Sequence, residues 1–222
     1  MTNDSPKDLI LDAAIVHVPF DGWSDVTLRA AIADSGVADG LARALFPRGG
    51  VDLALAYHAR GDAEMVARLA AMDLSALRFR DRIATGVRTR LELADKELVR
   101  RGTTLFSLPQ HAADGAKAIW STTDKIWTAL GDTSNDINWY TKRGTLSAVY
   151  GSTVLYWLGD GSLDTQATWE FLDRRIEQVM QFEKLKASLR ENPLGKALFN
   201  GPLKILERVR APKLPDNLPG RP

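Results

Sequence analysis

The sequence of 222 residues contains no cysteine and only three histidines, His17, His58 and His111. The missing cysteines exclude disulfides, thiolate nucleophiles and CxxC-type metal sites, and the isolated histidines cannot form an HExxH or Glu-x-x-His ligand set. Phosphate-binding glycine motifs and the GxSxG nucleophile motif are also absent from the sequence. We therefore expect a protein that is not an enzyme, with no catalytic residues, no metal and no cofactor.

Long apolar runs are missing as well. No stretch approaches the roughly 18 to 20 residues that cross a bilayer, and residues 1–7 lack the basic-then-apolar order of a signal peptide. We expect the mature protein to begin near Met1, on the cytoplasmic side. The 29 basic and 28 acidic side chains leave a net charge of +1, which gives no general attraction for nucleic acid.

Apolar residues recur at helical spacing through most of the chain, and no segment of useful length alternates with period two. Ser5 and Pro6 predict the start of a first helix that stops between Pro19 and Gly22. Two short helices should follow, and then six longer ones. The later helices are predicted over 27–36, 39–46, 51–72, 75–94, 95–108, 110–130, 136–158 and 165–189.

This pattern predicts an all-α fold in three parts. Residues 1–48 form a helix-turn-helix-like head, residues 49–190 a helical ligand-binding bundle, and residues 191–222 a basic amphipathic helix with a disordered tail. Residues 1–60 carry five basic and eight acidic side chains, a net charge of −3. Arg43 is the one long basic side chain of the expected recognition helix, 37–46, so DNA binding is disfavoured.

The corner between the helices 110–130 and 136–158 is unusually rich in aromatic residues. The helical register places Trp139, Tyr140 and Arg143 away from the deepest face, and exposed Trp, Tyr and Arg are typical of a protein-binding surface. The alternative is that Trp139 packs under the preceding loop. Asp132 and Asp136 flank the helix start, where capping of backbone amides is a simpler role than acid–base chemistry.

Basic residues gather near the C-terminus. Residues 184–213 hold eight basic and two acidic side chains, a net charge of +6, interleaved with an apolar stripe that is interrupted at Gly201-Pro202. This pattern is typical of a helix that lies in a membrane interface; the alternative is a last helix packed on the body or on a partner. The residues predicted to contact the membrane surface are Leu194, Lys196, Leu198, Phe199, Lys204, Ile205, Leu206, Arg208 and Val209.

Several strings together resemble the Coq-nine family of ubiquinone-biosynthesis proteins. They are Asp132-Thr-Ser-Asn-Asp136, Asn138-Trp-Tyr-Thr-Lys-Arg143, Tyr150 and Thr168-Trp-Glu-Phe-Leu172, and the opening segment 10–23 is similar too. The resemblance covers most of the chain and departs at the C-terminus, where prolines interrupt a helix that is amphipathic in the family. It implies a fold similar to the TetR regulators, with DNA binding lost and the cavity used for an isoprenoid or quinone lipid.

The resemblance also implies partners. The family presents its lipid to a demethoxyubiquinone hydroxylase, a membrane-associated di-iron enzyme, and another ubiquinone-pathway hydroxylase is an alternative. A TetR-like body often pairs through its last long helices, which implies a homodimer. Carried over to this sequence, the patch that binds the hydroxylase comprises Asp124, Ile126, Asp136, Trp139, Tyr140 and Arg143.

We therefore expect a non-enzymatic accessory protein, peripheral on the inner membrane, that takes up a polyprenyl-quinone intermediate and presents it to a hydroxylase. One alternative is a TetR-like, ligand-sensing DNA-binding regulator. Another is a small enzyme that uses Asp124, Asp132 and Asp136. The residues expected to line the lipid site are Phe79, Val87, Leu91, Leu105, Leu146, Val149, Tyr150 and Trp157.

Overall fold

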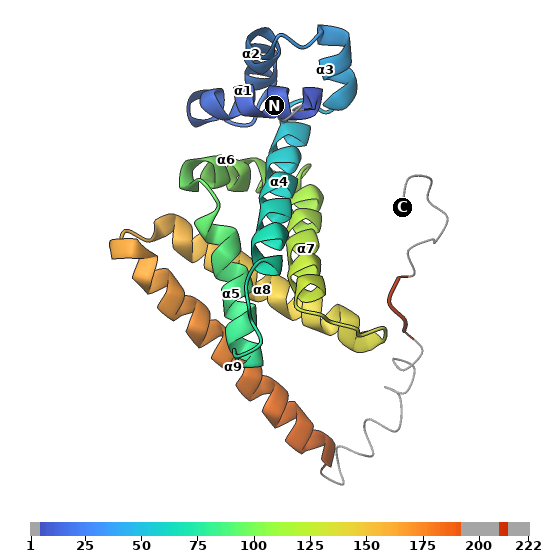
Figure 1. Cartoon of the computed structure of the whole chain (residues 1–222), viewed down its shortest axis with the longest axis vertical. Coiled ribbons are helices and arrows are strands. Elements are labelled where there is room, and N and C mark those ends of the chain that lie inside the picture. The colour runs from blue at the N-terminus through green and yellow to red at the C-terminus, as the bar shows by residue number, and fades with distance from the viewer. Residues whose placement is uncertain (1–4, 192–208, 213–222) are drawn as a thin grey trace.

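The structure is a computed structural model that describes residues 5–191 and 209–212. The described residues form α-helices with one short 3-10 turn and contain no strand, which confirms the all-α prediction (Figure 1). The helices are α1 (Pro6–Asp21), α2 (Asp25–Ser35), α3 (Asp39–Leu45), α4 (Gly50–Ala70), α5 (Phe79–Glu92), α6 (Lys96–Phe106), α7 (Ala112–Ala129), α8 (Ile137–Gly159) and α9 (Gln166–Glu191).

The helix ends follow local chemistry. The Ser5 hydroxyl accepts a hydrogen bond from the Asp8 amide at 3.2 Å and caps α1, as expected. Helix α1 continues through Pro19 and ends at Gly22, whose φ of 66° is unfavourable for other residues. Pro19 has no amide hydrogen to donate to the Ile15 carbonyl oxygen, so α1 lacks one backbone hydrogen bond in its last turn.

The predicted start of the helix 75–94 was wrong by four residues, because α5 begins at Phe79. Ahead of it, the Arg82 guanidinium donates hydrogen bonds to the carbonyl oxygens of Ser75 and Leu77, both at 3.0 Å. These bonds hold the segment before Phe79 as a turn, although its apolar spacing fits a helix.

The first three helices form a head that lies at one end of the bundle (Figure 1). Its core includes Ile10, Val18 and Phe46, and it extends to Leu53 of α4 and Leu98 of α6. The head therefore packs directly on the bundle.

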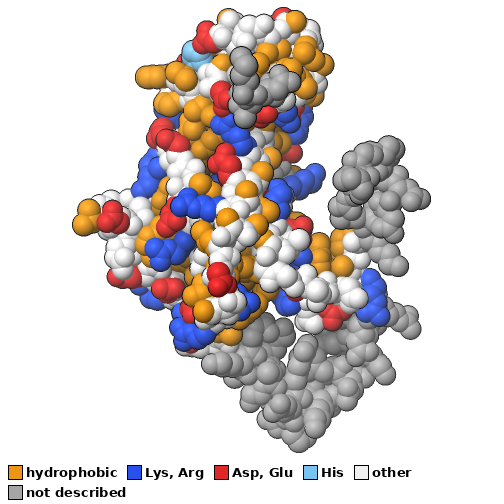
Figure 2. All heavy atoms as spheres, in the orientation of Figure 1, with side chains coloured by type: hydrophobic (Ala, Val, Ile, Leu, Met, Phe, Trp, Pro, Cys, Tyr) orange, Lys and Arg blue, Asp and Glu red, His pale blue; other side chains and the backbone are white. Residues whose placement is uncertain are grey.

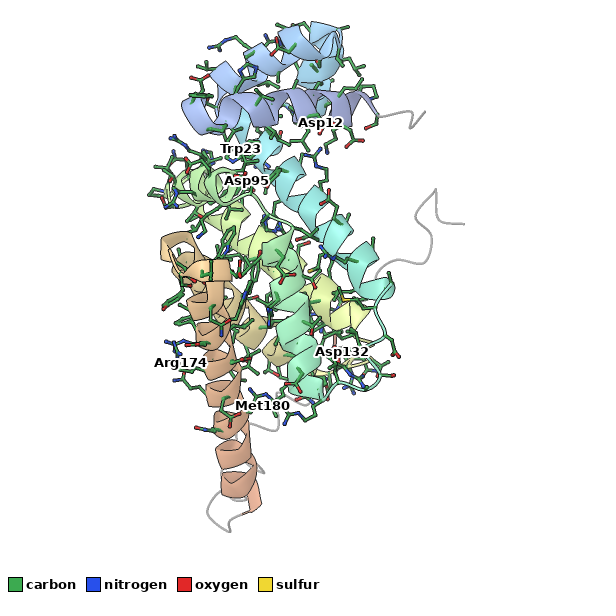
Figure 3. All side chains as sticks on the ribbon, turned by 60° about the vertical axis from the view of Figure 1, so that its left-hand side comes forward. Asp12, Trp23, Asp95, Asp132, Arg174 and Met180 are labelled. Atoms are coloured by element: carbon green, nitrogen blue, oxygen red, sulfur yellow. The ribbon has the colours of Figure 1, made fainter. Side chains whose placement is uncertain are left out.

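Trp23 fixes this junction. Its side chain is 5% exposed, and its indole N–H donates a hydrogen bond to the Leu98 carbonyl oxygen at 3.0 Å. Figure 3 shows Trp23 between the head and the bundle, close to Asp95 at the start of α6.

The bundle core joins α4, α5, α7, α8 and α9 around buried residues that include Met65, Ile126 and Leu172. Basic and acidic side chains are interspersed over the face shown in Figure 2. Within the described residues, no helix has the length and apolar character to cross a membrane.

Most of the predicted membrane-contact residues lie outside the described part of the chain. This applies to the eight residues from Leu194 to Arg208, so their role stays a prediction. Val209 is described and is partly buried, in a short segment that returns to the start of α8 (Figure 1).

Candidate functional site

A cavity of about 400 Å³, here called the large cavity, lies among α4, α5, α6, α7 and α8, with Trp23 in its wall on the head side. Its lining combines the buried Leu91, 2% exposed, with Leu155, 63% exposed, so the cavity opens to the surface. Most of the lining side chains are apolar. A cavity of this size and character can hold a small apolar ligand.

The residues predicted to line a lipid site are not all brought together. Leu91 and Tyr150 line the large cavity. Phe79, Leu146 and Val149 instead line a small cavity of about 230 Å³ between α5, α7, α8 and α9. The residues predicted to line one lipid site are therefore divided between two separate cavities.

Three predicted lining residues face neither cavity. Val87 and Trp157 are buried in the bundle core, and Leu105 packs against the head core. Helical spacing placed all three correctly on an inward face. It could not distinguish a side chain that fills the core from one that borders a hollow.

A cluster of polar side chains lies beside the large cavity and is named here the Asp62 cluster: Asp62, Arg90, Lys125, Thr122 and His58. Asp62 is fully buried, yet its carboxylate accepts hydrogen bonds from Arg90 Nε at 2.9 Å and Lys125 Nζ at 3.0 Å. The Thr122 hydroxyl adds a third bond at 2.8 Å. The buried charge is thus neutralised by donors from α5 and α7.

The absence of a side chain at residue 61 leaves room for Arg90 in this position. A Cβ atom at Gly61 would lie 2.9 Å from Arg90 Cζ. The Arg90 guanidinium therefore lies against the backbone of α4. It also donates a hydrogen bond to the His58 carbonyl oxygen at 3.2 Å.

His58 connects the Asp62 cluster to the large cavity, whose wall it joins. Its Nε2 lies 2.7 Å from Thr122 Oγ1 and 3.1 Å from the Ala118 carbonyl oxygen. Burial, assisted by the nearby cations Arg90 and Lys125, lowers the pKa of His58 although Asp62 opposes this effect. The imidazole is therefore neutral at pH 7.

The sequence analysis missed the Asp62 cluster. Its ionic members lie on three helices, so no local motif joins them. One signal was present: Asp62 and Arg90 occupy the same helical faces as buried apolar residues such as Met65 and Val87. A charge on such a face requires a buried partner.

A second group of side chains, named here the aromatic corner, comprises Trp120, Trp139, Tyr140 and Arg143 where α7 meets α8. The ring centroids of Trp139 lie 4.8 Å from Tyr140 and 5.9 Å from Trp120. Trp139 and Tyr140 are partly exposed. Trp120, which the sequence analysis did not single out, is the third aromatic member.

Arg143 was predicted to point away from the deepest face, and this is wrong, because its side chain is only 2% exposed. Its Nη1 lies 2.9 Å from Asp132 and its Nε lies 2.5 Å from Asp124. The guanidinium also lies over the Trp139 ring, 4.1 Å from the centroid. These partners explain how a charged side chain is buried beneath the corner.

The other predicted patch residues lie in different environments. Ile126 is fully buried in the bundle core and does not reach the surface. The Asp124 side chain is 40% exposed. Asp136 caps α8 by accepting a hydrogen bond from the Asn138 amide at 2.9 Å, as its position predicted.

Asp132 is not a cap, in contrast to the prediction, but the partner of two cations. Burial of its carboxyl opposes ionisation, yet hydrogen bonds from Lys142, Ser134 and Arg143 outweigh it and lower the pKa of Asp132 to about 2. Figure 3 shows Asp132 at the end of the bundle away from Trp23. A carboxylate held ionised in this way is a poor proton acceptor near neutral pH.

The described C-terminal segment, residues 209–212, contacts the aromatic corner. The Tyr140 hydroxyl donates a hydrogen bond to the Arg210 carbonyl oxygen at 3.2 Å. The Ala211 amide donates to the Asn135 carbonyl oxygen at 3.0 Å. The segment thus returns to the corner through its backbone.

Comparison with known proteins gives one family and several curated relatives. Residues 112–183 match the COQ9 family model. The chain is 31% identical to the mitochondrial ubiquinone biosynthesis protein COQ9 of Rattus norvegicus, over 86% of this chain and 64% of that protein. It is 30% identical to the corresponding Drosophila melanogaster protein, over 82% of this chain and 57% of the relative. The chain therefore spans about 60% of the length of these relatives.

Among solved structures, a TetR transcriptional regulator from Nitrosomonas europaea is similar in fold. The TM-score is 0.63 at 21% sequence identity, and the match covers 79% of this chain and 98% of the regulator. This confirms the TetR-like fold predicted above.

Asp132 yields a prediction about pH. Because its pKa is lowered on folding, its ionic contacts stabilise the protein above about pH 4, and this contribution is lost as the pH falls towards 2. Asp132→Asn should lower the free energy of unfolding by about 2 kcal/mol at pH 7, and by less than about 1 kcal/mol at pH 2.5. Urea unfolding at several pH values measures both quantities. Asp136→Asn, which keeps a capping side chain, is the control, and an Asp132→Asn deficit of equal size at both pH values would contradict the assignment.

Proposed function

Because the chain is similar to a COQ9 protein over 86% of its length, we propose that it belongs to that family and is a non-enzymatic accessory protein of ubiquinone biosynthesis that binds an isoprenoid or quinone lipid and presents it to a ring hydroxylase. The observation that carries this proposal is the large cavity, about 400 Å³ in volume and mostly apolar in its lining. Its opening beside the exposed Leu155 gives a lipid a route from the surface.

The lack of a convincing catalytic group agrees with a carrier. Among the described residues, no three His, Asp or Glu side chains are grouped so that they could hold a metal ion. The three carboxylates of the enzyme alternative are otherwise engaged: Asp124 and Asp132 bind Arg143, and Asp136 caps α8. The chemistry would then belong to the partner.

The aromatic corner is the surface that we propose for the hydroxylase, a demethoxyubiquinone hydroxylase or another enzyme of the pathway. Buried Arg143 supports the partly exposed Trp139 from below, and Tyr140 packs against its edge. Rigidly supported aromatic side chains are the residues that most often dominate the free energy of protein association.

Two further elements complete the proposal. Residues 194–209 would bind the surface of the inner membrane through their basic and apolar side chains, so the protein would be peripheral. A homodimer would pair through the last two long helices, α8 and α9.

A DNA-binding regulator is less well supported. The head of this chain carries a net charge of −3 over residues 1–60. Arg43, the basic side chain of the short α3, is paired with Asp39 at 2.9 Å. Both features oppose binding to phosphates.

The cavity predicts the behaviour of co-purifying lipid. Val154→Phe adds bulk to the cavity wall and should reduce the amount of bound isoprenoid or quinone severalfold, as measured by mass spectrometry of gently purified protein. Val16→Phe makes the same change at a position that is 68% exposed on α1, and it should leave the bound lipid unchanged. Equal lipid content in the two variants would argue against binding in the large cavity.

The aromatic corner predicts partner binding. Trp139→Ala or Tyr140→Ala should weaken hydroxylase binding by about 30-fold, because an interface hot spot contributes ~2 kcal/mol or more. Isothermal titration with the purified hydroxylase measures the loss, and thermal unfolding checks that the fold survives. Leu163→Ala, at an 85% exposed site after α8, is the matched control. Unchanged affinity in both aromatic variants would remove the corner as the docking surface.

The C-terminal residues predict membrane binding. A chain lacking residues 192–222 should no longer float with vesicles that contain anionic lipid. Replacing Lys196, Lys204 and Arg208 with Gln should weaken binding to anionic vesicles by about fivefold per residue, since each charge contributes ~1 kcal/mol. Binding to uncharged vesicles should change little. Flotation of the truncated chain equal to that of the full chain would refute the assignment.

A further inference from the structure

His58 lines the large cavity, and one of its ring nitrogens, Nδ1, has no hydrogen-bond partner among the described residues. The Nε2 atom is engaged with α7, at 2.7 Å from Thr122 Oγ1 and 3.1 Å from the Ala118 carbonyl oxygen. No hydrogen bond to Nδ1 is made by the described residues. The question is whether Nδ1 carries a proton.

The neighbours of Nε2 decide the tautomer. The Ala118 carbonyl oxygen has no proton to give, and the Thr122 hydroxyl proton is directed to the buried Asp62 carboxylate at 2.8 Å. Nε2 must therefore be the protonated nitrogen, donating to Thr122 or to Ala118. In a neutral imidazole this leaves Nδ1 as a hydrogen-bond acceptor.

Tyr57 presents the complementary group. It lines the same cavity and precedes His58 on α4. Its hydroxyl oxygen accepts a hydrogen bond from the Asp95 amide at 3.1 Å, whereas the hydroxyl proton has no acceptor among the described residues. Two residues in the wall of the same cavity thus have unused hydrogen-bonding capacity among the described residues: an acceptor on His58 and a donor on Tyr57.

The rest of the wall is shaped for an apolar ligand. Trp23 lies beside Tyr57, with ring centroids 5.4 Å apart, and Ala54, Leu98 and Val154 continue the lining. A ligand that satisfies both polar groups needs an oxygen that accepts and a hydroxyl that donates.

We propose that the large cavity selects the reduced, hydroquinone form of a ring-bearing lipid, whose hydroxyl donates to Nδ1 of His58. This rests on the lipid-binding function proposed above and specifies the ligand. A quinone carbonyl can accept from Tyr57 but cannot donate to His58, so binding the quinone leaves an acceptor unsatisfied in an apolar wall. An isoprenoid hydrocarbon satisfies neither group.

The test compares one compound in two oxidation states. A short-chain prenylated benzoquinone and its hydroquinone are titrated separately, without oxygen, into the full chain, and tryptophan fluorescence reports binding. The hydroquinone should bind about 3- to 10-fold more tightly, the range expected for one neutral hydrogen bond at a desolvated site. The hydroquinone dimethyl ether, which has oxygens but no donor, should bind like the quinone.

Variants identify the atom responsible. His58→Phe keeps a planar ring and removes the acceptor, so the preference for the hydroquinone should fall to about onefold. Tyr57→Phe should weaken both oxidation states alike, because both can accept from the hydroxyl. His17→Phe makes the same change as His58→Phe, on α1 in the head, where His17 pairs with Asp34, and it should leave the preference for the hydroquinone unchanged. Circular dichroism confirms that each variant is folded.

The outcomes separate this inference from the function on which it rests. Binding of both forms with equal affinity to the wild-type chain, or tighter binding of the quinone, overturns the selectivity but leaves lipid binding intact. A preference that survives in His58→Phe also overturns it. If neither form binds and no lipid co-purifies, the lipid-binding function itself fails.

Discussion

Asp62 holds a negative charge out of contact with water, and the way in which neighbouring helices neutralise it sets the geometry of the bundle. Arg90 from α5 and Lys125 from α7 converge on its two carboxylate oxygens. Loss of one partner from a buried ion pair commonly costs about 3–5 kcal/mol, so α4, α5 and α7 are constrained to one arrangement. The same arrangement orients His58 towards Thr122 and leaves a polar edge on an otherwise apolar cavity.

Buried ion pairs are also found at the other end of the bundle, where they support the aromatic corner. Asp132 and Asp124 bind Arg143, whose buried guanidinium supports the ring of Trp139. Here the ionic contacts stabilise a surface instead of a hollow. In the function proposed above, the protein receives a lipid at one place and meets an enzyme at another, and each place lies beside a carboxylate with two cationic partners.

Helix positions could be predicted from the sequence because their determinants are local. Ser5 and Asp136 cap the helices that their positions predicted, and apolar spacing gives most of the remaining bounds. The apolar spacing of the segment before Phe79 fits a helix equally well, but hydrogen bonds from Arg82, and a turn bond from the Leu77 amide to the Leu74 carbonyl oxygen, stabilise it as a turn. Such a contact has no signature in apolar periodicity.

The candidate site was harder to predict because its contacts join distant residues. Asp62 and Arg90, which form a hydrogen bond, are 28 positions apart in the sequence. The helical register predicted an exposed Arg143, but its side chain is buried against Asp132. The family resemblance implied a surface patch around Trp139, Tyr140 and Arg143 and included Ile126 in it, but the structure buries Ile126 completely. A cavity forms where inward-facing side chains of different helices do not fill the space between them. The apolar periodicity of a single helix does not show where this happens.

The close approach of Arg90 to Gly61 has an evolutionary consequence. A side chain at position 61 would push against a guanidinium that Asp62 and the His58 carbonyl oxygen hold in place, so Arg90 would have to shift and its hydrogen bonds would weaken. Loss of Arg90 in turn leaves the buried Asp62 with fewer donors. Positions 61, 62 and 90 should therefore change together, because replacing one of them alone weakens the buried ion pair between Asp62 and Arg90 and lowers the stability of the protein.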